Sequence, residues 1–343
     1  MDKTTLILHV DSPDAPEIKT VAEILKNGGT AAIPTETVYG LAANALSAEA
    51  AAKIFVAKGR PADNPLIVHI SHISQLGDIV SEIPETAVKL AESFWPGPLT
   101  IILPKQPHIP EIVTAGLDTV AVRMPSHPIA HALIEQAGIP LAAPSANRSG
   151  RPSPTSWRHC VEDLDGRVDA ILCADDSDIG VESTVITLAT PVPKVLRPGG
   201  ITVEQLRSVL GEVEVDSAVL NELAPDAVAA SPGMKYKHYA PKASVIIVDA
   251  DTNAYIDFVN SKADEGAFAL CFEEDVPHIN IPCVVCGTAE DESTYAHALF
   301  TALRELDEKG AVTAYARKPS SDGMGLAVYN RLLRAAAFNI IKP

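Results

Sequence analysis

The sequence contains no run of eighteen or more apolar residues, and it does not open with a basic segment followed by an apolar one. We therefore expect neither a membrane-spanning helix nor a secretory leader. Basic residues are fewer than acidic ones: the chain has 27 Lys and Arg and 44 Asp and Glu, which gives a net charge of −17. This deficit argues against broad, sequence-independent binding to nucleic acid, which depends on dense Lys and Arg. An anionic ligand must instead be met by a local group of cations.

Cysteine is also sparse and odd in number. Five residues in a chain of 343 do not suggest a disulfide framework, so a reducing compartment fits, and we predict a cytoplasmic protein without membrane contact. Cys283 and Cys286 form a C-x-x-C pair, but they lie in an apolar segment, and no second pair or spaced histidines accompany them. We interpret them as core residues of a strand and predict no metal site built by the protein.

Several catalytic and nucleotide-binding patterns are missing as well. The chain lacks the G-x-x-x-x-G-K-[ST] pattern of a P-loop and the G-x-G-x-x-G turn of dinucleotide-binding domains. It also lacks G-x-S-x-G and a Ser-His-Asp order of residues. A P-loop nucleotidase and a hydrolase with a serine nucleophile are therefore not expected.

The length and the pattern of elements predict two α/β domains. A chain of 343 residues exceeds one average domain of about 150 residues. In the first part, helices and strands mingle without a regular βαβ period, which favours a mixed sheet, whereas the last part alternates strand and helix. We predict a mixed α/β domain over 1–211, a linker over 212–242 and a smaller Rossmann-like domain over 243–343. In the first domain we expect helices at 16–27, 47–58, 84–94, 128–138 and 202–211, and strands at 30–35, 66–70, 99–103, 119–124, 140–145, 169–173, 183–188 and 193–197.

Polar residues gather where the expected strands end. They include Thr35, Glu36, Thr37 and Tyr39, then Arg123, then Ser145, Asn147, Arg148 and Arg151, and finally Arg197. Ordinary turn chemistry and surface exposure could explain any one of these segments. Four segments with the same pattern favour a ligand site, because ligands of open α/β sheets tend to lie at strand ends.

The segment KGRPADNPL places two cations, Lys58 and Arg60, on a loop that Pro61 and Pro65 restrict. One interpretation is a helix end completed by cations, with Gly59 as the stop. A second interpretation is a phosphate clamp, because a lysine point charge and a planar arginine fork are complementary tools for a polyphosphate. Both interpretations can hold at once.

Seven successive segments carry a resemblance to a known family. The chain resembles the YrdC-type L-threonylcarbamoyl-adenylate synthases over roughly residues 15 to 205, in PTETVYGLAANA, KGRPADNPLIVHI, FWPGPLTIIL, VAVRMPSHP, APSANRSGRPSPT, ESTVITL and LRPGG. The later segment SPGMKYKHYAPKA, followed by a Rossmann-like tail, resembles the two-domain form. The resemblance implies a YrdC-like mixed, twisted open sheet with flanking helices, a linker, and a smaller Rossmann-like domain.

The reaction implied by the resemblance condenses L-threonine, bicarbonate and ATP into threonylcarbamoyl-AMP and pyrophosphate. This is a nucleotidyl transfer with Mg²⁺ accompanying ATP, and it is the first step toward the threonylcarbamoyl group on adenosine 37 of tRNA. Expected partners are the three substrates and downstream threonylcarbamoyl-transferase proteins, with tRNA involved only indirectly.

The resemblance also assigns residues. It implies that Lys58 and Arg60 are catalytic, and it gives no catalytic role to Glu36 or Glu182. The implied L-threonine pocket consists of Thr35, His69, Arg123, Ala143 and Ser183. The implied ATP site consists of Lys58, Arg60, Asn64, Thr119, Ser145, Asn147, Arg197 and Tyr239.

Three other hypotheses remain. The linker could close over the site as a lid, since it combines Lys235, Tyr236, Lys237, His238 and Tyr239, which suit a nucleotide, although a plain linker is an equal alternative. The first domain could be a double-stranded-RNA-binding module, although residues 1–207 carry 16 Lys and Arg against 24 Asp and Glu. It could also be a carbamoyltransferase, although the zinc-finger and acylphosphatase modules that accompany such enzymes are not recognised here.

Overall fold

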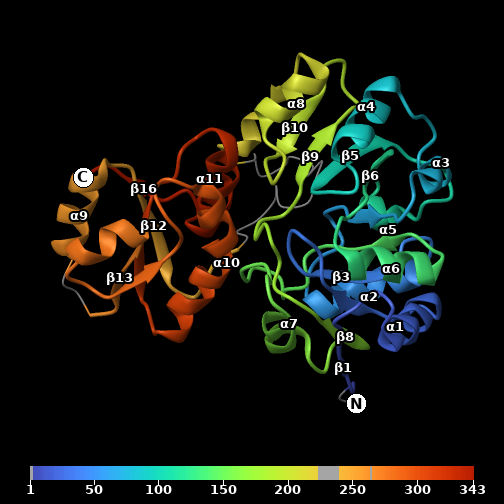
Figure 1. Ribbon diagram of the computed structural model, residues 1–343, viewed down its shortest axis with the longest axis horizontal. Coiled ribbons are helices and arrows are strands. Elements are labelled where there is room, and N and C mark those ends of the chain that lie inside the picture. Colours follow the sequence, from blue (N-terminus) through green and yellow to red (C-terminus); the bar gives the residue numbers. More distant parts are fainter. Residues whose placement is uncertain (1–2, 223–238, 263–264) are drawn as a thin grey trace.

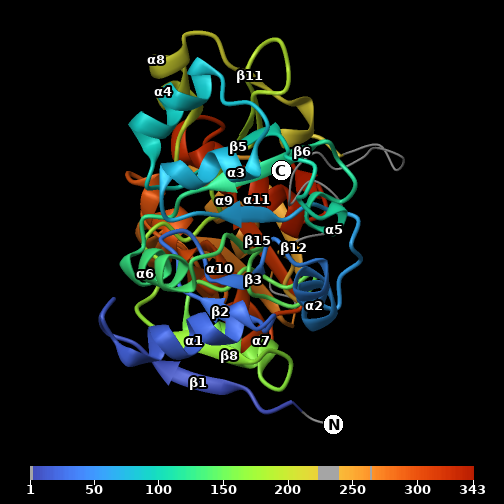
Figure 2. The same ribbon diagram turned by 90° about the vertical axis from the view of Figure 1, so that its right-hand side faces the viewer.

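The computed structural model describes residues 3–222, 239–262 and 265–343, and it contains two sheets, each with its own helices (Figure 1). The larger sheet has eleven strands in the order β1-β8-β2-β3-β7-β4-β6-β5-β9-β10-β11. Viewed from the side, β1 and β11 lie at opposite ends of this sheet (Figure 2). Its strands are β1 (Leu6–His9), β2 (Ala31–Ile33), β3 (Gly40–Asn44), β4 (Ile67–His69), β5 (Leu99–Pro104), β6 (Thr119–Arg123), β7 (Leu141–Ala142), β8 (Ala170–Cys173), β9 (Thr184–Thr187), β10 (Lys194–Arg197) and β11 (Glu214–Val215).

Parallel and antiparallel neighbours are mixed in this sheet, which confirms the predicted fold class. For example, β4 runs parallel to β6, whereas β5 runs antiparallel to it. Helices cover both faces. One face is covered by α1 (Pro16–Lys26) and α6 (Pro128–Ala137), and the other by α2 (Ala48–Lys58), α4 (Glu85–Phe94), α7 (Trp157–Leu164) and α8 (Val203–Leu210). The shorter turns are η1 (Ile73–Gln75), α3 (Leu76–Ile79), α5 (Glu111–Thr114) and η2 (Ser217–Val219).

Local sequence chemistry sets the helix that leads to the predicted cation pair. Ser47 caps α2 by accepting a hydrogen bond from the backbone N of Ala50 at 3.2 Å. Gly59 ends the helix with a φ of 62°, a left-handed conformation that glycine adopts without strain. The stop at Gly59 was predicted from the sequence, and it fixes where Lys58 leaves the helix.

Some elements have weak sequence patterns and were not predicted. The strand β3 consists of Gly, Leu, Ala, Ala and Asn, residues with little β propensity, and it forms because it pairs with β2 and β7. The strand β11 lies within the expected linker and pairs with β10. The rest of the expected linker includes Lys235, Tyr236, Lys237 and His238, which lie outside the described residues.

The smaller sheet is entirely parallel, with the order β14-β13-β15-β12-β16. Its helix α9 packs on one face, and α10 and α11 pack on the other face, toward the larger sheet (Figure 1). This arrangement confirms the predicted Rossmann-like alternation. The elements are β12 (Ser244–Val248), α9 (Thr252–Asn260), β13 (Ala267–Cys271), η3 (Glu273–His278), β14 (Cys283–Val285), α10 (Glu292–Glu308), β15 (Thr313–Arg317), α11 (Gly323–Ala335) and β16 (Ile340–Ile341).

The two parts share buried surface. Val38 and Val181 of the first part belong to the same apolar cluster as Leu299 of α10 and Val328 of α11. Gly180 lies so close to α10 that a Cβ atom there would come within 2.4 Å of the Cα atom of His297. The smaller sheet therefore contacts the larger one through α10 and α11. In the described ranges, no helix is long and apolar enough to cross a membrane.

Candidate active site

The predicted strand ends meet around one cavity in the larger part. Arg123 ends β6, Arg197 ends β10 and His69 ends β4, while Thr35 follows β2 and Ser145 follows β7. The free space among the lining side chains is about 60 Å³, well below the roughly 300 to 1,000 Å³ of typical ligand pockets. The lining includes Thr35, Thr37, Lys58, Arg60, His69, Arg123, Ala143, Ser145, Asn147, Glu182, Ser183, Arg197 and Tyr239.

Two of the predicted site residues do not line this cavity. Asn64 is buried, and its carbonyl accepts a hydrogen bond from Nη2 of Arg60 at 2.9 Å, so it lies beside the lining without joining it. Thr119 is the first residue of β6, whereas Arg123 is the last. Because a strand rises about 3.4 Å per residue, the two lie roughly 13 Å apart along β6.

Lys58 is almost fully buried, with 3% of its surface exposed. Its ammonium group donates to the carbonyl of Ser145, to the carbonyl of Asn147 at 2.7 Å and to Oδ1 of Asn147 at 3.3 Å. Burial, and then the charge of Arg60, lower the pKa of Lys58 to about 7. The lysine is therefore held against the lining loop, and an approaching anion would favour its charged form.

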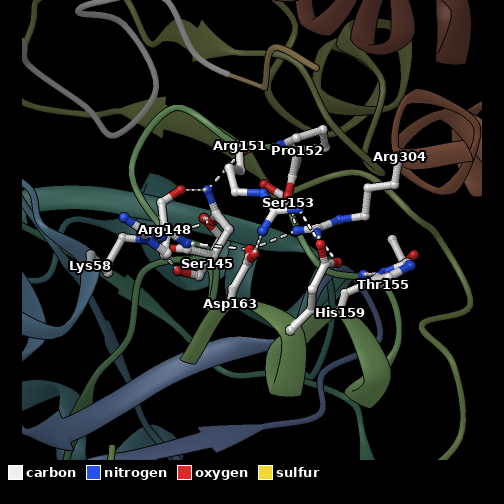
Figure 3. Close-up of polar contacts among 12 residues, drawn as sticks. Lys58, Ser145, Arg148, Arg151, Pro152, Ser153, Thr155, His159, Asp163 and Arg304 are labelled. Carbon is white, nitrogen blue, oxygen red and sulfur yellow. Dashed lines mark hydrogen bonds and ion pairs between the residues drawn. The ribbon is translucent and has the colours of Figure 1, made fainter. Parts of the chain in front are cut away.

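A charged network holds the loop of residues 145–151 beside Lys58 (Figure 3). Asp163 of α7 pairs with Arg151 of that loop, and its side chain is fully buried. The same carboxylate accepts a hydrogen bond at 2.8 Å from Nη2 of Arg304, which belongs to α10. One buried carboxylate thus joins the loop to a helix of the smaller part.

Arg123 is held by three protein groups. Its Nη1 donates to the hydroxyl of Thr37 at 2.9 Å, its Nε donates to the carbonyl of Gly97 at 3.3 Å, and its Nη2 lies 2.8 Å from Glu36. That last contact brings the charges together without hydrogen-bond geometry. Burial alone would raise the pKa of Glu36, but Arg123 together with backbone N–H groups outweighs burial, and the pKa falls below its usual value. The Arg123 guanidinium therefore lines the cavity as one half of a buried ion pair.

Neutral groups complete this side of the cavity. Burial, and then the charge of Arg123, lower the pKa of His69 to about 3, so the imidazole is neutral at physiological pH. Thr35 donates its hydroxyl hydrogen to the carbonyl of Val38 at 2.5 Å, and Ser183 adds a second hydroxyl to the lining. Together with Arg123, they form a small wall that combines one fixed cation with hydroxyl groups.

Glu182, an acid to which the sequence assigned no catalytic role, has an ion-pair partner that the sequence did not predict. It lines the cavity, accepts a hydrogen bond from Ser153 at 2.5 Å and accepts another at 2.7 Å from Nε of Arg331, on α11. Burial raises its pKa, but Arg331 and Arg197 outweigh burial, and the pKa lies below the ordinary value. The guanidinium of Arg331 also lies 5.9 Å from the ring centre of Tyr239. A sequence clue existed, since Arg331 falls on the apolar face of an otherwise buried helix.

The donor set has few ligands for a metal ion. Over residues 3–222, 239–262 and 265–343, no group of three or more His, Cys, Asp or Glu side chains could hold one. Glu182 and Glu36, the carboxylates nearest the cavity, are each paired with an arginine. A divalent ion brought by a polyphosphate would thus depend on phosphate oxygens and water for most of its ligands.

Two family models match successive parts of the chain. The model of the Sua5, YciO and YrdC proteins, described as telomere recombination, matches residues 23–199. The model described as the C-terminal domain of threonylcarbamoyl-AMP synthase matches residues 201–337. Between them, the two matches include every lining residue of the cavity and both helices, α10 and α11, through which the smaller part contacts the larger one.

Full-length relatives agree with both matches. A threonylcarbamoyl-AMP synthase of Pyrococcus abyssi is 45% identical, with 98% of this chain and 99% of the relative covered, and one of Bacillus subtilis is 45% identical, with 96% of each covered. The crystal structure of P. abyssi Sua5 complexed with L-threonine matches with a TM-score of 0.91 and 44% identity, over 99% of this chain and 100% of that one. The chain therefore belongs to the threonylcarbamoyl-AMP synthase family, in the form that carries both the Sua5–YciO–YrdC domain and the Sua5 C-terminal domain.

Proposed function

We propose that this chain is a threonylcarbamoyl-AMP synthase that joins L-threonine, bicarbonate and ATP, as a nucleotidyltransferase. The observation that carries the proposal is the convergence of Lys58, Arg123 and Arg197 on one cavity with several hydroxyl side chains, in a chain whose full-length relatives are synthases. The cations suit a carboxylate and phosphates. A P-loop or a serine nucleophile is not needed for this chemistry.

In the proposed reaction, the amine of threonine attacks bicarbonate and water leaves, which gives a carbamate. A carbamate oxygen then attacks the α-phosphorus of ATP, and pyrophosphate departs with the electron pair of the broken bond. The nucleophile belongs to the substrate, so the protein has to bring the reactants together and stabilise charge on the phosphate oxygens. Groups fixed before the substrates bind serve both tasks.

Arg123 is the proposed partner of the threonine carboxylate. It lines the cavity, and its position is fixed by Thr37, Gly97 and Glu36. Thr35, His69, Ala143 and Ser183 are the proposed walls around the threonine side chain. Because Thr35 and Ser183 present hydroxyls, the pocket should discriminate against amino acids that lack a hydroxyl.

Lys58 and Arg60 are the proposed catalytic clamp on the triphosphate. Lys58 is held in place before ATP binds, and the phosphates would replace protein carbonyls as partners of its ammonium group. The remaining proposed ATP contacts are Asn64, Thr119, Ser145, Asn147, Arg197 and Tyr239. Mg²⁺ is proposed to arrive on ATP and to bind mainly phosphate oxygens and water.

The two alternative functions are weaker. An RNA-binding module would need an exposed basic track, yet Lys58, Arg123 and Arg197 are each at most 5% exposed. A carbamoyltransferase is disfavoured because relatives over nearly the whole chain are synthases. Transfer of the product to tRNA by downstream proteins and action in the cytoplasm stay predictions.

Pyrophosphate release by the purified protein tests the proposal. ATP and Mg²⁺ are supplied, and threonine and bicarbonate are omitted one at a time. Release is expected only when both are present. Release that needs neither, or no release in the complete mixture, would contradict a synthase.

A further inference from the structure

The carboxyl edge of the smaller sheet holds a cavity of about 500 Å³, which we call the C-terminal cavity. It is defined by Asn253 and Asp257 of α9, Glu274 of η3 and Arg317 at the end of β15. Its volume lies within the roughly 300 to 1,000 Å³ of ligand pockets. None of its lining residues lines the cavity around Lys58. The helix α9 lies on the side of the smaller sheet that faces away from the larger one (Figure 1).

The order of the strands explains why a cavity forms here. From β13 the chain moves outward to β14, whereas from β15 it moves in the opposite direction to β16. The connections that follow the neighbouring strands β13 and β15 therefore run in opposite directions, which leaves a crevice at the carboxyl ends of these two strands. Ligands of parallel α/β sheets bind in such crevices, although this one has no glycine-rich phosphate turn.

One wall of the C-terminal cavity can receive an anion. Arg317 is 13% exposed, pairs with the buried Asp275 and donates to the hydroxyl of Thr252 at 2.5 Å. Its guanidinium carbon lies 4.8 Å from the ring centre of Phe272. These contacts fix the guanidinium plane and use only part of its five N–H donors. Asn253 also lines this cavity.

The other wall is acidic. Asp257 follows Asn253 by four residues, so both lie on one face of α9, about 6 Å apart along the helix axis. The carboxylate of Glu274 accepts hydrogen bonds from the backbone N of Ala289 at 3.1 and 3.2 Å, which holds it at the rim. Both acids lie on exposed parts of the surface.

This charge distribution selects among ligand classes. Three carboxylates, Arg317 and His278 line the C-terminal cavity, so a phosphate dianion would meet a net negative charge whichever form the histidine takes. A zwitterion meets an opposite charge at each pole. The spacing of about 6 Å along α9 suits an α-amino acid, whose two charged groups are a few bonds apart and would each form a hydrogen bond near 2.8 Å.

We propose that the C-terminal cavity binds a small zwitterion of the α-amino acid type. The carboxylate of the ligand contacts Arg317 and Asn253, and its ammonium group contacts Asp257 and Glu274. Ile256 and Ala289 supply the apolar surface for its side chain. This site is separate from the proposed threonine pocket at Arg123, so it does not depend on the proposed synthase reaction.

Calorimetric titration of the full-length protein with each proteinogenic α-amino acid in turn, without ATP or bicarbonate, tests this proposal. Asn253→Glu places a negative charge at the carboxylate pole, and Asp257→Asn removes charge from the ammonium pole. Both positions are exposed, and a glutamate in the first turn of a helix favours the helix dipole, so folding should persist. Asn339→Glu is the matched control, because Asn339 is exposed and directly precedes β16, at the amino edge of the same sheet.

At least one amino acid should bind the natural protein and the Asn339→Glu control. Its affinity should fall about tenfold or more in both cavity variants, as expected when a charge-assisted contact is lost. If that amino acid is threonine, two binding events are expected, of which only one is lost. The proposal is overturned if no amino acid binds at millimolar concentration, or if binding is unchanged in both cavity variants. It is also overturned if inorganic phosphate binds instead and binds more tightly after Asp257→Asn.

Discussion

The cavity around Lys58 and the C-terminal cavity both lie at strand ends, but they hold their charges differently. Around Lys58 the free space is about 60 Å³, and Lys58, Arg123 and Arg197 are each at most 5% exposed. The C-terminal cavity measures about 500 Å³, and Asp257 on its wall is exposed. Buried charges must be paired with protein groups, whereas exposed charges are stabilised by water. The charged groups around Lys58 are therefore held in place before substrate binds, and they must give up contacts with protein groups in order to bind it. The C-terminal cavity is open and should bind its ligand more weakly.

Removing a fixed cation should have the largest effect. Lys58→Ala is expected to lower the rate of pyrophosphate release at least about 100-fold, because an aligned charge at the phosphates is lost. Lys19→Ala, at an exposed position of α1, is the matched control and should retain full activity. Both rates are measured at saturating substrates, with circular dichroism to compare folding. Equal turnover of the two variants would show that Lys58 does not serve as a clamp.

The contact between the two parts gives the largest expected effect on stability. Arg331→Met leaves the buried carboxylate of Glu182 without its ion-pair partner, and the free energy of unfolding should fall by about 3 to 5 kcal/mol. The double variant Arg331→Met with Glu182→Gln removes both charges and should regain part of that loss. Urea unfolding of both variants measures the difference. Additive losses in the double variant would mean that the pair is not energetically coupled.

The sequence predicts the cavity around Lys58 better than it predicts the buried ion pairs beside that cavity. Gly59, Arg123 and Arg197 were found because helix stops and strand ends are local features of the sequence. The partners Glu182 and Arg331 are 149 residues apart, and Asp163 and Arg304 are 141 residues apart, so only the folded chain brings them together. The C-terminal cavity was missed for a related reason, since it depends on the order of strands in the sheet, which has no local pattern.

Proton uptake provides a finer test of the difference between buried and exposed charges. The pKa of Lys58 is about 7, so at pH 8 most of the free protein has a neutral lysine there. Phosphate oxygens favour the charged form of Lys58 and raise that pKa, so the protein should take up protons when ATP binds. The uptake should reach at most about 0.9 protons per site at pH 8 and should be far smaller at pH 6.

Calorimetric titration of ATP in buffers with different ionisation enthalpies measures this uptake. Lys58→Met should abolish it. Uptake rather than release of protons is expected, because burial lowers the pKa of Lys58 in the free protein and the bound anion raises that pKa again. Proton release at pH 8, or an uptake that persists in Lys58→Met, would place the titrating group elsewhere.

The smallest expected effects come from two helix caps, one beside each cavity. Ser47 caps α2, which ends at Lys58, and Asp251 caps α9, which lines the C-terminal cavity. Either substitution by alanine should lower the free energy of unfolding by about 1 kcal/mol, since one hydrogen bond to a helix N–H group is lost.

Ser47→Ala should leave pyrophosphate release nearly unchanged, because Lys58 is held by Ser145 and Asn147 at the far end of the helix. Asp251→Ala should weaken amino-acid binding at the C-terminal cavity, because the first turn of α9 forms its wall. If Ser47→Ala instead lowers the rate of pyrophosphate release strongly, the position of Lys58 depends on the helix α2 rather than on the loop that the lysine contacts.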